Sequence, residues 1–240
     1  MNKLLIIVML ATSVISYSQK KTSDSSNFDF NFDLGISSRN IWRGLDYGSA
    51  PSVWGDLYGS FKSFSIGAMG TTTLNGSKAQ YGTWLELYAS YEFKGISLII
   101  DDYFFFNAED KDNNFFDYSP DHTQHLVEAR IEYDNDYLKA LVGYVIYSNR
   151  ADKTNGVYLE ATYKLNKKLS FTTGYLTGPQ SLSFYDDGGV TTLGINGHKS
   201  VKFGGQTLNL KASLILNPNY ANASPTVGNN PVYFILSSDF

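Results

Sequence analysis

The side chains of this sequence that could do chemistry are mostly charged residues on alternate positions of apolar segments. Charges that share one face of many segments need water or partners, so we expect them to line a polar interior. Their excess of carboxylates predicts a preference for cations. The same charges could instead form a paired ionic core that fills the interior. The set comprises Asp29, Asp33, Asp56, Glu86, Glu92, Glu128, Glu132 and Glu160, with Arg130, Lys139, Lys164 and Lys211.

The three histidines are the next candidates. His122 and His125 begin a segment beside an acidic stretch, with Ser119 near in sequence. Some lipid hydrolases use His with Ser, but the chain has no nucleophile motif such as G-x-S-x-G. At strand spacing, positions 122 and 125 fall on opposite faces. We therefore predict surface histidines, His198 included, no catalytic residues and no enzyme, with a lipid-modifying enzyme as an alternative.

One acidic stretch has the spacing of a Ca²⁺ loop, in Asp110, Asp112, Asn114 and Asp121. It carries Phe115 where such a loop needs Gly, and no helices flank it, so we expect a solvated acidic loop. The chain has no Cys, and it has no metal-spaced Cys/His cluster and no phosphate-binding fingerprint. We predict no metal and no cofactor.

The N-terminal residues predict export. Lys3 precedes the apolar run 4–15, and Ser16-Tyr17-Ser18 has the small-x-small pattern of a cleavage site. We predict a signal peptide over 1–18, a polar lead-in over 19–26 and one domain over 27–240. The later chain has no apolar window as long as a membrane helix. A net charge of -4 argues against a nucleic-acid partner.

The fold class follows from strict alternation of apolar and polar residues, which predicts strands. Short connections alternate with long ones, and aromatic residues make up 15% of the chain, as in a membrane β-barrel. We predict an all-β, antiparallel transmembrane barrel of about twelve strands, or ten if 190–203 forms none. The weakly patterned stretch 96–106 is read as a strand that crosses the outer interface. The short turns are expected at 62–63, 94–95, 135–136, 167–168 and 204–205, and the long loops near 37–51, 75–80, 107–121, 148–155, 178–192 and 217–230.

The last stretch, PVYFILSSDF over 231–240, also alternates and ends on Phe240. An unpaired strand edge is costly, above all in hydrocarbon, so we expect it to close against the first strand. A final strand that ends in Phe resembles the C-terminal signature of bacterial outer-membrane barrels, which implies contact with the barrel-assembly machinery through Phe240. A soluble two-sheet sandwich would show the same alternation.

Residues 37–51, SSRNIWRGLDYGSAP, contain Ser37, Arg39, Arg43, Gly44 and Pro51. This segment resembles the S-R-Y-x-(F/W)-R-G-x-(S/T)…P motif of the TorF-like porin family, with Asn40 in place of Tyr. The resemblance implies a β-barrel in the cell outer membrane, in contact with outer-membrane lipid. The expected function is a porin or channel for passive passage of small hydrophilic solutes. A closed structural or adhesin-like barrel that acts through its outer loops is the alternative.

The two arginines of this segment have a physical interpretation of their own. If the first strand continues upward, Arg39 and Arg43 keep the parity of Asp29 and Asp33. Both would then face the lumen at the outer mouth, and Trp42 would face lipid. The arginines could steer a substrate, or they could tie the first loop to carboxylates of neighbouring loops.

Overall fold

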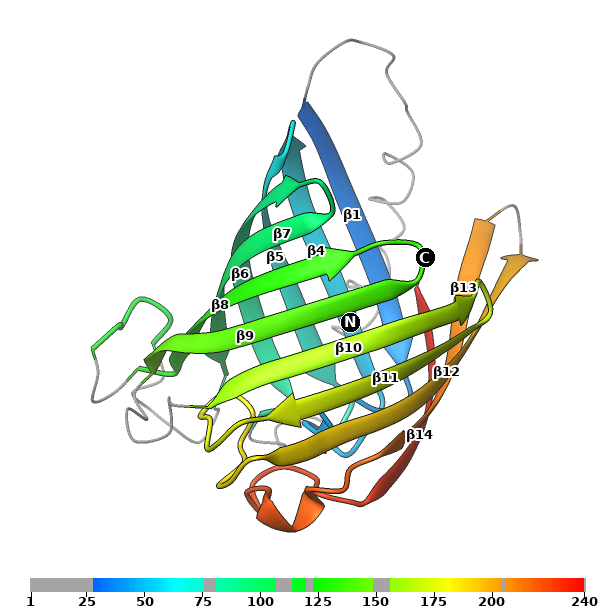
Figure 1. The fold of residues 1–240 in the computed structure, drawn as a ribbon. Helices are drawn as coiled ribbons and strands as arrows, with labels where there is room; N and C mark the ends of the chain where they lie inside the picture. Colours follow the sequence, from blue (N-terminus) through cyan, green and yellow to red (C-terminus); the bar gives the residue numbers. More distant parts are fainter. Residues whose placement is uncertain are drawn as a thin grey trace, which may run out of the picture.

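The computed structural model describes residues 28–75, 81–106, 114–119, 123–148, 156–203 and 206–239. Twelve of its strands form one closed antiparallel barrel, and two short strands form a separate hairpin (Figure 1). The barrel strands are β1 (Phe28–Ser37), β4 (Ser52–Phe61), β5 (Phe64–Thr73), β6 (Thr83–Phe93), β7 (Ile96–Phe105), β8 (His125–Asp134), β9 (Leu138–Ser148), β10 (Val157–Asn166), β11 (Leu169–Leu176), β12 (Gly189–Phe203), β13 (Gln206–Leu216) and β14 (Val232–Asp239). The hairpin is β2 (Ile41–Trp42) and β3 (Leu45–Asp46), and a short 3-10 helix, η3, spans Tyr220–Asn222.

The predicted strand count of twelve is confirmed. Strand β7 covers the weakly patterned stretch. Strand β12 covers 190–203, and its residues Leu193–Phe203 pair with β13. None of the described residues forms a helix that is long and apolar enough to cross a membrane. The segments predicted as a signal peptide and a polar lead-in, and Phe240, lie outside the described residues.

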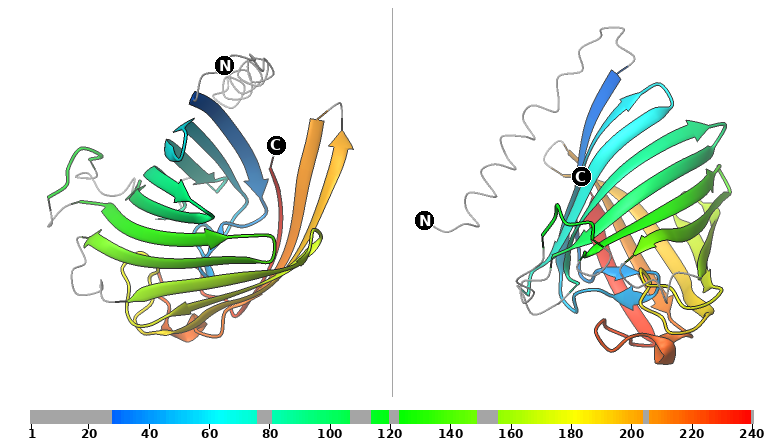
Figure 2. Two further views of the ribbon diagram at one scale, coloured as in Figure 1. Left: turned by 45° about the horizontal axis from the view of Figure 1, so that its top comes forward. Right: turned by 90° about the vertical axis from the view of Figure 1, so that its left-hand side faces the viewer.

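The barrel closes where β14 lies between β13 and β1 (Figure 2). Among the described residues the seam with β1 consists of three pairs, between Gly35–Ser37 and Ser237–Asp239. Ser38 extends it, because its backbone N–H donates to the carbonyl of Leu236 at 2.7 Å. The expected closure of the last strand on the first is therefore confirmed, and the soluble sandwich is wrong for this chain.

The connections sort by length to the two ends of the barrel (Figure 1). Two-residue turns at 62–63, 94–95 and 167–168 lie at one end, which we call the short-turn end. The segments that follow β1, β11 and β13 lie at the other, the long-loop end. The predicted alternation of short and long connections is confirmed for these segments, and the predicted turn at 204–205 lies outside the described residues.

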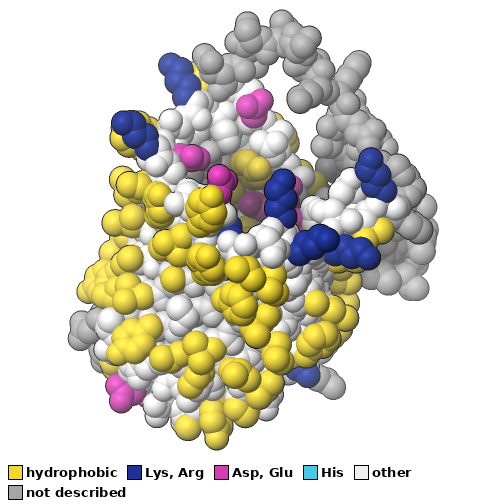
Figure 3. Space-filling view, turned by 45° about the vertical axis from the view of Figure 1, so that its right-hand side comes forward, with side chains coloured by type: hydrophobic (Ala, Val, Ile, Leu, Met, Phe, Trp, Pro, Cys, Tyr) yellow, Lys and Arg dark blue, Asp and Glu magenta, His cyan; other side chains and the backbone are white. Residues whose placement is uncertain are grey.

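The outer wall of the barrel is apolar. Large hydrophobic side chains at alternate strand positions are exposed there, and Figure 3 shows them spread over the wall. Phe30 is 66% exposed, Ile66 55% and Phe234 64%. A continuous exposed apolar surface of this extent is unusual for a protein surrounded by water.

The long-loop half of the interior is filled by an aromatic-rich core. Its members come from the hairpin, the strands and the long loops: Leu45, Tyr47, Tyr81, Trp84, Tyr103, Phe105, Leu126, Val145, Tyr158, Leu176, Leu182, Phe184, Tyr185, Ala223 and Val227. Trp42 packs against this core, with its ring 5.4 Å from that of Tyr103. The prediction that Trp42 faces lipid is wrong, because the first strand ends at Ser37 and the chain then folds inward.

Candidate functional site

The hairpin β2–β3 carries the SSRNIWRG motif into the barrel and places Arg43 at its tip. Arg43 and Gly44 form the two-residue turn, with φ of 52° and 84°, as tight hairpin turns require. A Cβ at Gly44 would lie 2.0 Å from the carbonyl oxygen of Thr191, so the wall leaves room for glycine alone. Arg43 has a left-handed backbone conformation, which is uncommon for non-glycine residues and is found mainly at active sites, ligand clamps and switch regions.

The Arg43 guanidinium is anchored to the barrel wall by an ion pair. Its Nη2 lies 2.6 Å from Oε2 of Glu128, and both side chains are almost wholly buried. Its Nη1 donates to Gln180 and Ser183 of the loop between β11 and β12, at 3.1 and 3.2 Å. Burial by itself would lower the pKa of Arg43, but the charge of Glu128 and the hydrogen bond to it outweigh burial and raise it, so Arg43 stays cationic.

Local features of β8 and β9 make room for this pair. The register between the two strands shifts between Val127 and Glu128, and such bulges redirect side chains. Gly143 on β9 leaves the space that the pair occupies, because a Cβ there would lie 2.6 Å from Oε1 of Glu128. The backbone of the barrel wall is therefore shaped to accommodate the Arg43–Glu128 pair.

The guanidinium also lies over two aromatic rings, 4.4 Å from the centre of Trp42 and 4.2 Å from that of Tyr158, where cation–π attraction adds to the anchor. The backbone of the turn makes fewer contacts than the Arg43 side chain. Tyr185 donates to the carbonyl of Arg43 at 3.1 Å, and Asn217 donates to that of Gly44 at 2.9 Å.

Arg39 does not reach the lumen wall. Its Nη1 lies 2.7 Å from Oδ2 of Asp46, at the end of the same hairpin, and its side chain is 41% exposed. The backbones of Asp46 and Gly228 exchange two hydrogen bonds. Among the described residues, neither arginine pairs with a carboxylate of a neighbouring loop: Arg39 pairs within its own segment, and Arg43 pairs with Glu128 of strand β8. Arg43 does lie in the lumen, but the hairpin carries it there and a continued first strand does not.

Below the hairpin, toward the short-turn end, one side of the lumen is acidic. A cavity of about 420 Å³ under Trp42 is lined by Asp56, Glu86, Arg130, Glu132 and Lys139, among others. Arg130 is the hub of this wall. Its Nε and Nη2 contact the two carboxylate oxygens of Asp101 at 2.6 and 2.8 Å, and Glu86 and Glu132 approach it at 3.7 and 3.6 Å. The sequence reasoning missed Asp101.

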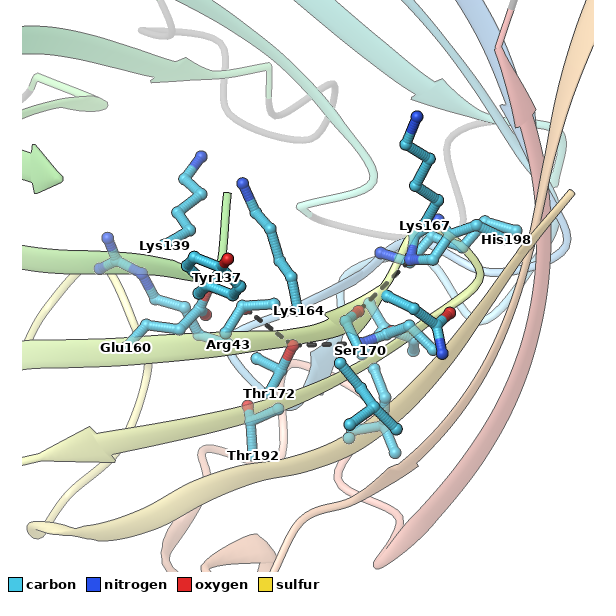
Figure 4. A pocket seen from close by; sticks show the side chains of 18 of the residues that line it. Arg43, Tyr137, Lys139, Glu160, Lys164, Lys167, Ser170, Thr172, Thr192 and His198 are labelled. Atoms are coloured by element: carbon cyan, nitrogen blue, oxygen red, sulfur yellow. Dashed lines mark hydrogen bonds between the residues drawn. The ribbon is translucent and has the colours of Figure 1, made fainter. Parts of the chain in front are cut away.

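The opposite side of the lumen is basic. A cavity of about 1050 Å³, which we call the basin, extends from Arg43 and Trp42 to the turns at 135–137 and 167–168. Four of the predicted lumen residues line the basin: Lys139, Glu160, Lys164 and Lys211. Figure 4 labels the first three of these. His198, Lys167 and Asp136 line it too.

The remaining predicted residues lie on the acidic side or near the rim. Asp33 is exposed on β1 and is the register partner of Asp56 on β4, whose carboxylate accepts from Tyr88 at 3.0 Å. Asp29 and Glu92 are exposed residues near the short turns. Strand order thus separates the charges: carboxylates prevail on β1 and β4–β8, and lysines prevail on β9–β13.

His125 is wholly buried, so the prediction of a surface histidine is wrong for this residue. It belongs to a second polar cluster, on the outer face of the wall. Its Nδ1 lies 2.8 Å from Asp102, and its Nε2 lies 2.6 Å from the carbonyl oxygen of Phe115. The ring of Tyr118 stacks on it at 3.9 Å, and the Tyr118 hydroxyl donates to Asp102 at 2.6 Å. Burial and this hydrogen bond raise the pKa of Tyr118 to about 12, so its hydroxyl remains a donor.

Both ring nitrogens of His125 are thus engaged, which leaves neither to activate a nucleophile. We expect His125→Ala to leave the lipids of the membrane unmodified relative to wild type and to lower the unfolding free energy by about 1–3 kcal/mol, because Asp102 loses its buried partner. Lipid mass profiles and denaturant unfolding measure the two effects. A lipid product that disappears with the histidine would contradict this and restore the enzyme alternative.

Of the four residues with the spacing of a Ca²⁺ loop, Asn114 lies within the described residues, and its Oδ1 accepts a hydrogen bond from the backbone of Phe116 at 3.0 Å. Asp110, Asp112, Asp121 and His122 lie outside them. Within the described ranges, no group of three His, Asp or Glu side chains is placed to hold a metal ion.

The architecture defines a closed, twelve-stranded antiparallel β-barrel that encloses polar cavities. No protein-family model matches the chain, and no curated protein matches it, so membership of the TorF-like family stays a prediction. A porin triple mutant of Rhodopseudomonas blastica aligns over 89% of this chain and 100% of its own, at 10% identity and a TM-score of 0.38. The strand pairing described above, rather than so low a score, defines the fold.

A second solved barrel also aligns. Wzi of Escherichia coli, an outer-membrane, carbohydrate-binding β-barrel involved in group 1 capsule assembly, matches 88% of this chain at 10% identity, with a TM-score of 0.36. This chain spans 56% of the length of Wzi.

Proposed function

We propose that this protein is an outer-membrane channel for small hydrophilic solutes whose lumen is closed, in this structure, by the hairpin β2–β3. The observation that carries the proposal is the placement of Arg43. The hairpin is not part of the barrel wall, and it fills the lumen above a charged cavity. Its tip is held by one ion pair and a few hydrogen bonds.

The membrane location rests on the outer wall. Closed barrels leave no free strand edge across the bilayer, and the membrane-spanning kind presents apolar residues outward and polar residues inward. The exposed Phe, Ile and Leu side chains of this wall fit hydrocarbon. Lys62 and Lys94 lie at the short turns, each near the ring of the preceding Phe at 5.3 and 5.1 Å. Such lysines suit a headgroup boundary, and the short turns would face the periplasm.

The hairpin suits a gate because it can leave without breaking the barrel. Its strands pair with each other and not with a barrel strand. Its link to Gly228 involves the loop between β13 and β14. The hydrogen bonds between the barrel strands would therefore remain if the hairpin left the lumen. The polar inner walls would then border a continuous aqueous path.

Planar-bilayer conductance tests the proposal. A variant in which a Gly-Ser-Gly linker replaces residues 40–47 keeps the barrel strands intact, since Asn40 and Tyr47 are already joined by a backbone hydrogen bond of 2.9 Å. We expect rare or small events from the wild type and frequent, larger events from the variant. Absence of events in both, with the barrel shown to be folded, would overturn the channel proposal.

The ion preference of the opened channel is part of the proposal. Carboxylates outnumber cations in the predicted lumen set by eight to four, so we expect a reversal potential that favours cations. The measurement uses the linker variant in a KCl gradient. A reversal potential that favours anions would contradict the expectation.

A closed structural barrel that acts through its outer loops is the second candidate. The observation in its favour is the apolar core of the long-loop half, which joins hairpin, wall and loops. Protease shaving of the outer loops that abolishes surface adhesion, with conductance absent in the linker variant, would favour it.

A further inference from the structure

The basin gathers basic side chains from three strands, and from one turn, on one side of the lumen. Lys139 comes from β9, Lys164 from β10, Lys167 from the turn after β10, and Lys211 from β13. Figure 4 shows Lys139, Lys164 and Lys167 extending in the same direction, away from the wall that carries Ser170 and Thr172. The basin thus presents ammonium groups to the space enclosed by the barrel.

The charges of the basin do not balance internally. Against the four lysines, the lining holds two carboxylates, Asp136 and Glu160. The hydroxyl of Tyr158 donates to Glu160 at 2.7 Å. The chain as a whole carries a net charge of -4, so this surplus of positive charge is local.

Two of the lysines are already engaged and two are available. Lys139 lies 3.0 Å from Glu132 of the acidic wall, and Lys164 contacts Asp134 and donates to the carbonyl of Asn135. Neither Lys167 nor Lys211 has an ion-pair partner within the described part of the chain. An anion could therefore contact them without first breaking a salt bridge.

Neutral donors and acceptors lie beside these lysines. The Ser170 hydroxyl and Nε2 of His198 are 3.3 Å apart. Thr172 shares its hydroxyl with Thr162 at 2.9 Å and accepts from Asn196 at 3.1 Å. Hydroxyl, amide and imidazole groups of this kind suit a ligand that itself carries hydroxyls. A volume of about 1050 Å³ accommodates a sugar-sized solute with its water.

We propose that the basin binds a small hydroxylated anion, such as a sugar phosphate or a sugar acid, from the short-turn end of the barrel. Lys211 and Lys167 supply the charge, and Ser170, His198 and Thr172 contact the hydroxyls. This assignment names the solute class of the proposed channel and rests on that proposal for the periplasmic direction of entry.

Calorimetric titration of the purified barrel in detergent tests this directly. The probes are glucose 6-phosphate, glucuronate and, as the uncharged control, glucose. We expect both anions to bind and glucose to give no heat of binding. We expect Lys211→Gln to weaken anion binding about tenfold, the loss of one close charge contact. The matched control is Lys199→Gln, which removes an equal charge from the neighbouring strand β12 on the outward-facing parity and should leave affinity unchanged.

The outcomes separate the binding site from the channel. Absence of anion binding to wild type, equal losses in the two lysine variants, or binding of glucose as tight as that of the anions would each overturn the proposal. Binding of one anion alone that depends on Lys211 supports it and identifies the phosphate or the carboxylate as the group recognised. Because the titration needs no open lumen, a failure of conductance leaves its result valid.

Discussion

Glu128→Ala should open the barrel. The substitution leaves the Arg43 guanidinium buried without its counter-charge, and removal of one partner of a buried ion pair costs about 3–5 kcal/mol. The penalty falls on the inserted hairpin, because outside the barrel Arg43 regains water. We therefore expect the closed population to fall by a factor of about 100 or more. In planar bilayers this would appear as frequent openings approaching those of the linker variant.

Three further variants make the test specific to the ion pair. Arg43→Ala removes the other partner and should also open the barrel. The double variant Arg43→Ala/Glu128→Ala should be less open than the sum of the two single effects predicts, since it leaves no unpaired charge. Arg39→Ala alters an arginine of the same hairpin that is 41% exposed and bound within its own loop, so it should change conductance far less. Equal effects at Arg39 and Arg43 would contradict the gate.

The strands of the barrel could be predicted because alternation is local. Each strand needs an apolar outer face and a smaller or polar inner face, and both are visible residue by residue. Adjacent Asp101 and Asp102 on β7 look like a break in this pattern. They satisfy it, since Asp101 turns inward to Arg130 and Asp102 turns outward to His125 and Tyr118. The outward-facing carboxylate of Asp102 is stabilised by His125 and Tyr118, which are distant from it in sequence.

The gate could not be predicted from strand parity, because parity holds only while a strand continues. Extrapolation beyond Ser37 placed Trp42 in lipid, whereas the chain leaves the wall and returns through a hairpin. One local signal was available. Arg43-Gly44, with Trp42 before it and Leu45 after it, has the form of a two-residue hairpin turn between apolar residues. The partner of Arg43 was not predictable, because Glu128 lies 85 residues away and meets it only after the barrel closes.

The separation of acidic and basic walls was partly predictable, unlike the strands, which were fully so, and the hairpin, which was not. Carboxylates dominate the early strands and lysines the late ones along the sequence itself. In an antiparallel barrel built by successive hairpins, neighbours in sequence become neighbours around the wall, so the separation follows from strand order. Which charges pair depends on register, and register depends on the stagger of every preceding strand.

Arg130→Gln should be the most destabilising single change on the acidic wall. Arg130 is 17% exposed, and Asp101 beneath it is wholly buried. The variant leaves Asp101, Glu86 and Glu132 close together without the cation that holds them, so we expect a loss of about 3–5 kcal/mol in unfolding free energy. Urea unfolding in lipid vesicles, followed by tryptophan fluorescence, measures it.

Lys139→Gln is the matched control for this loss, because Lys139 binds the same Glu132 but is 43% exposed. We expect it to cost less than about 1 kcal/mol, as surface ion pairs do. A large difference between the two variants means that the ionic hub below the hairpin is a dry structural element, so solutes must pass on the basin side. Equal small losses would mean that water reaches the hub, and the acidic wall itself would then border the path.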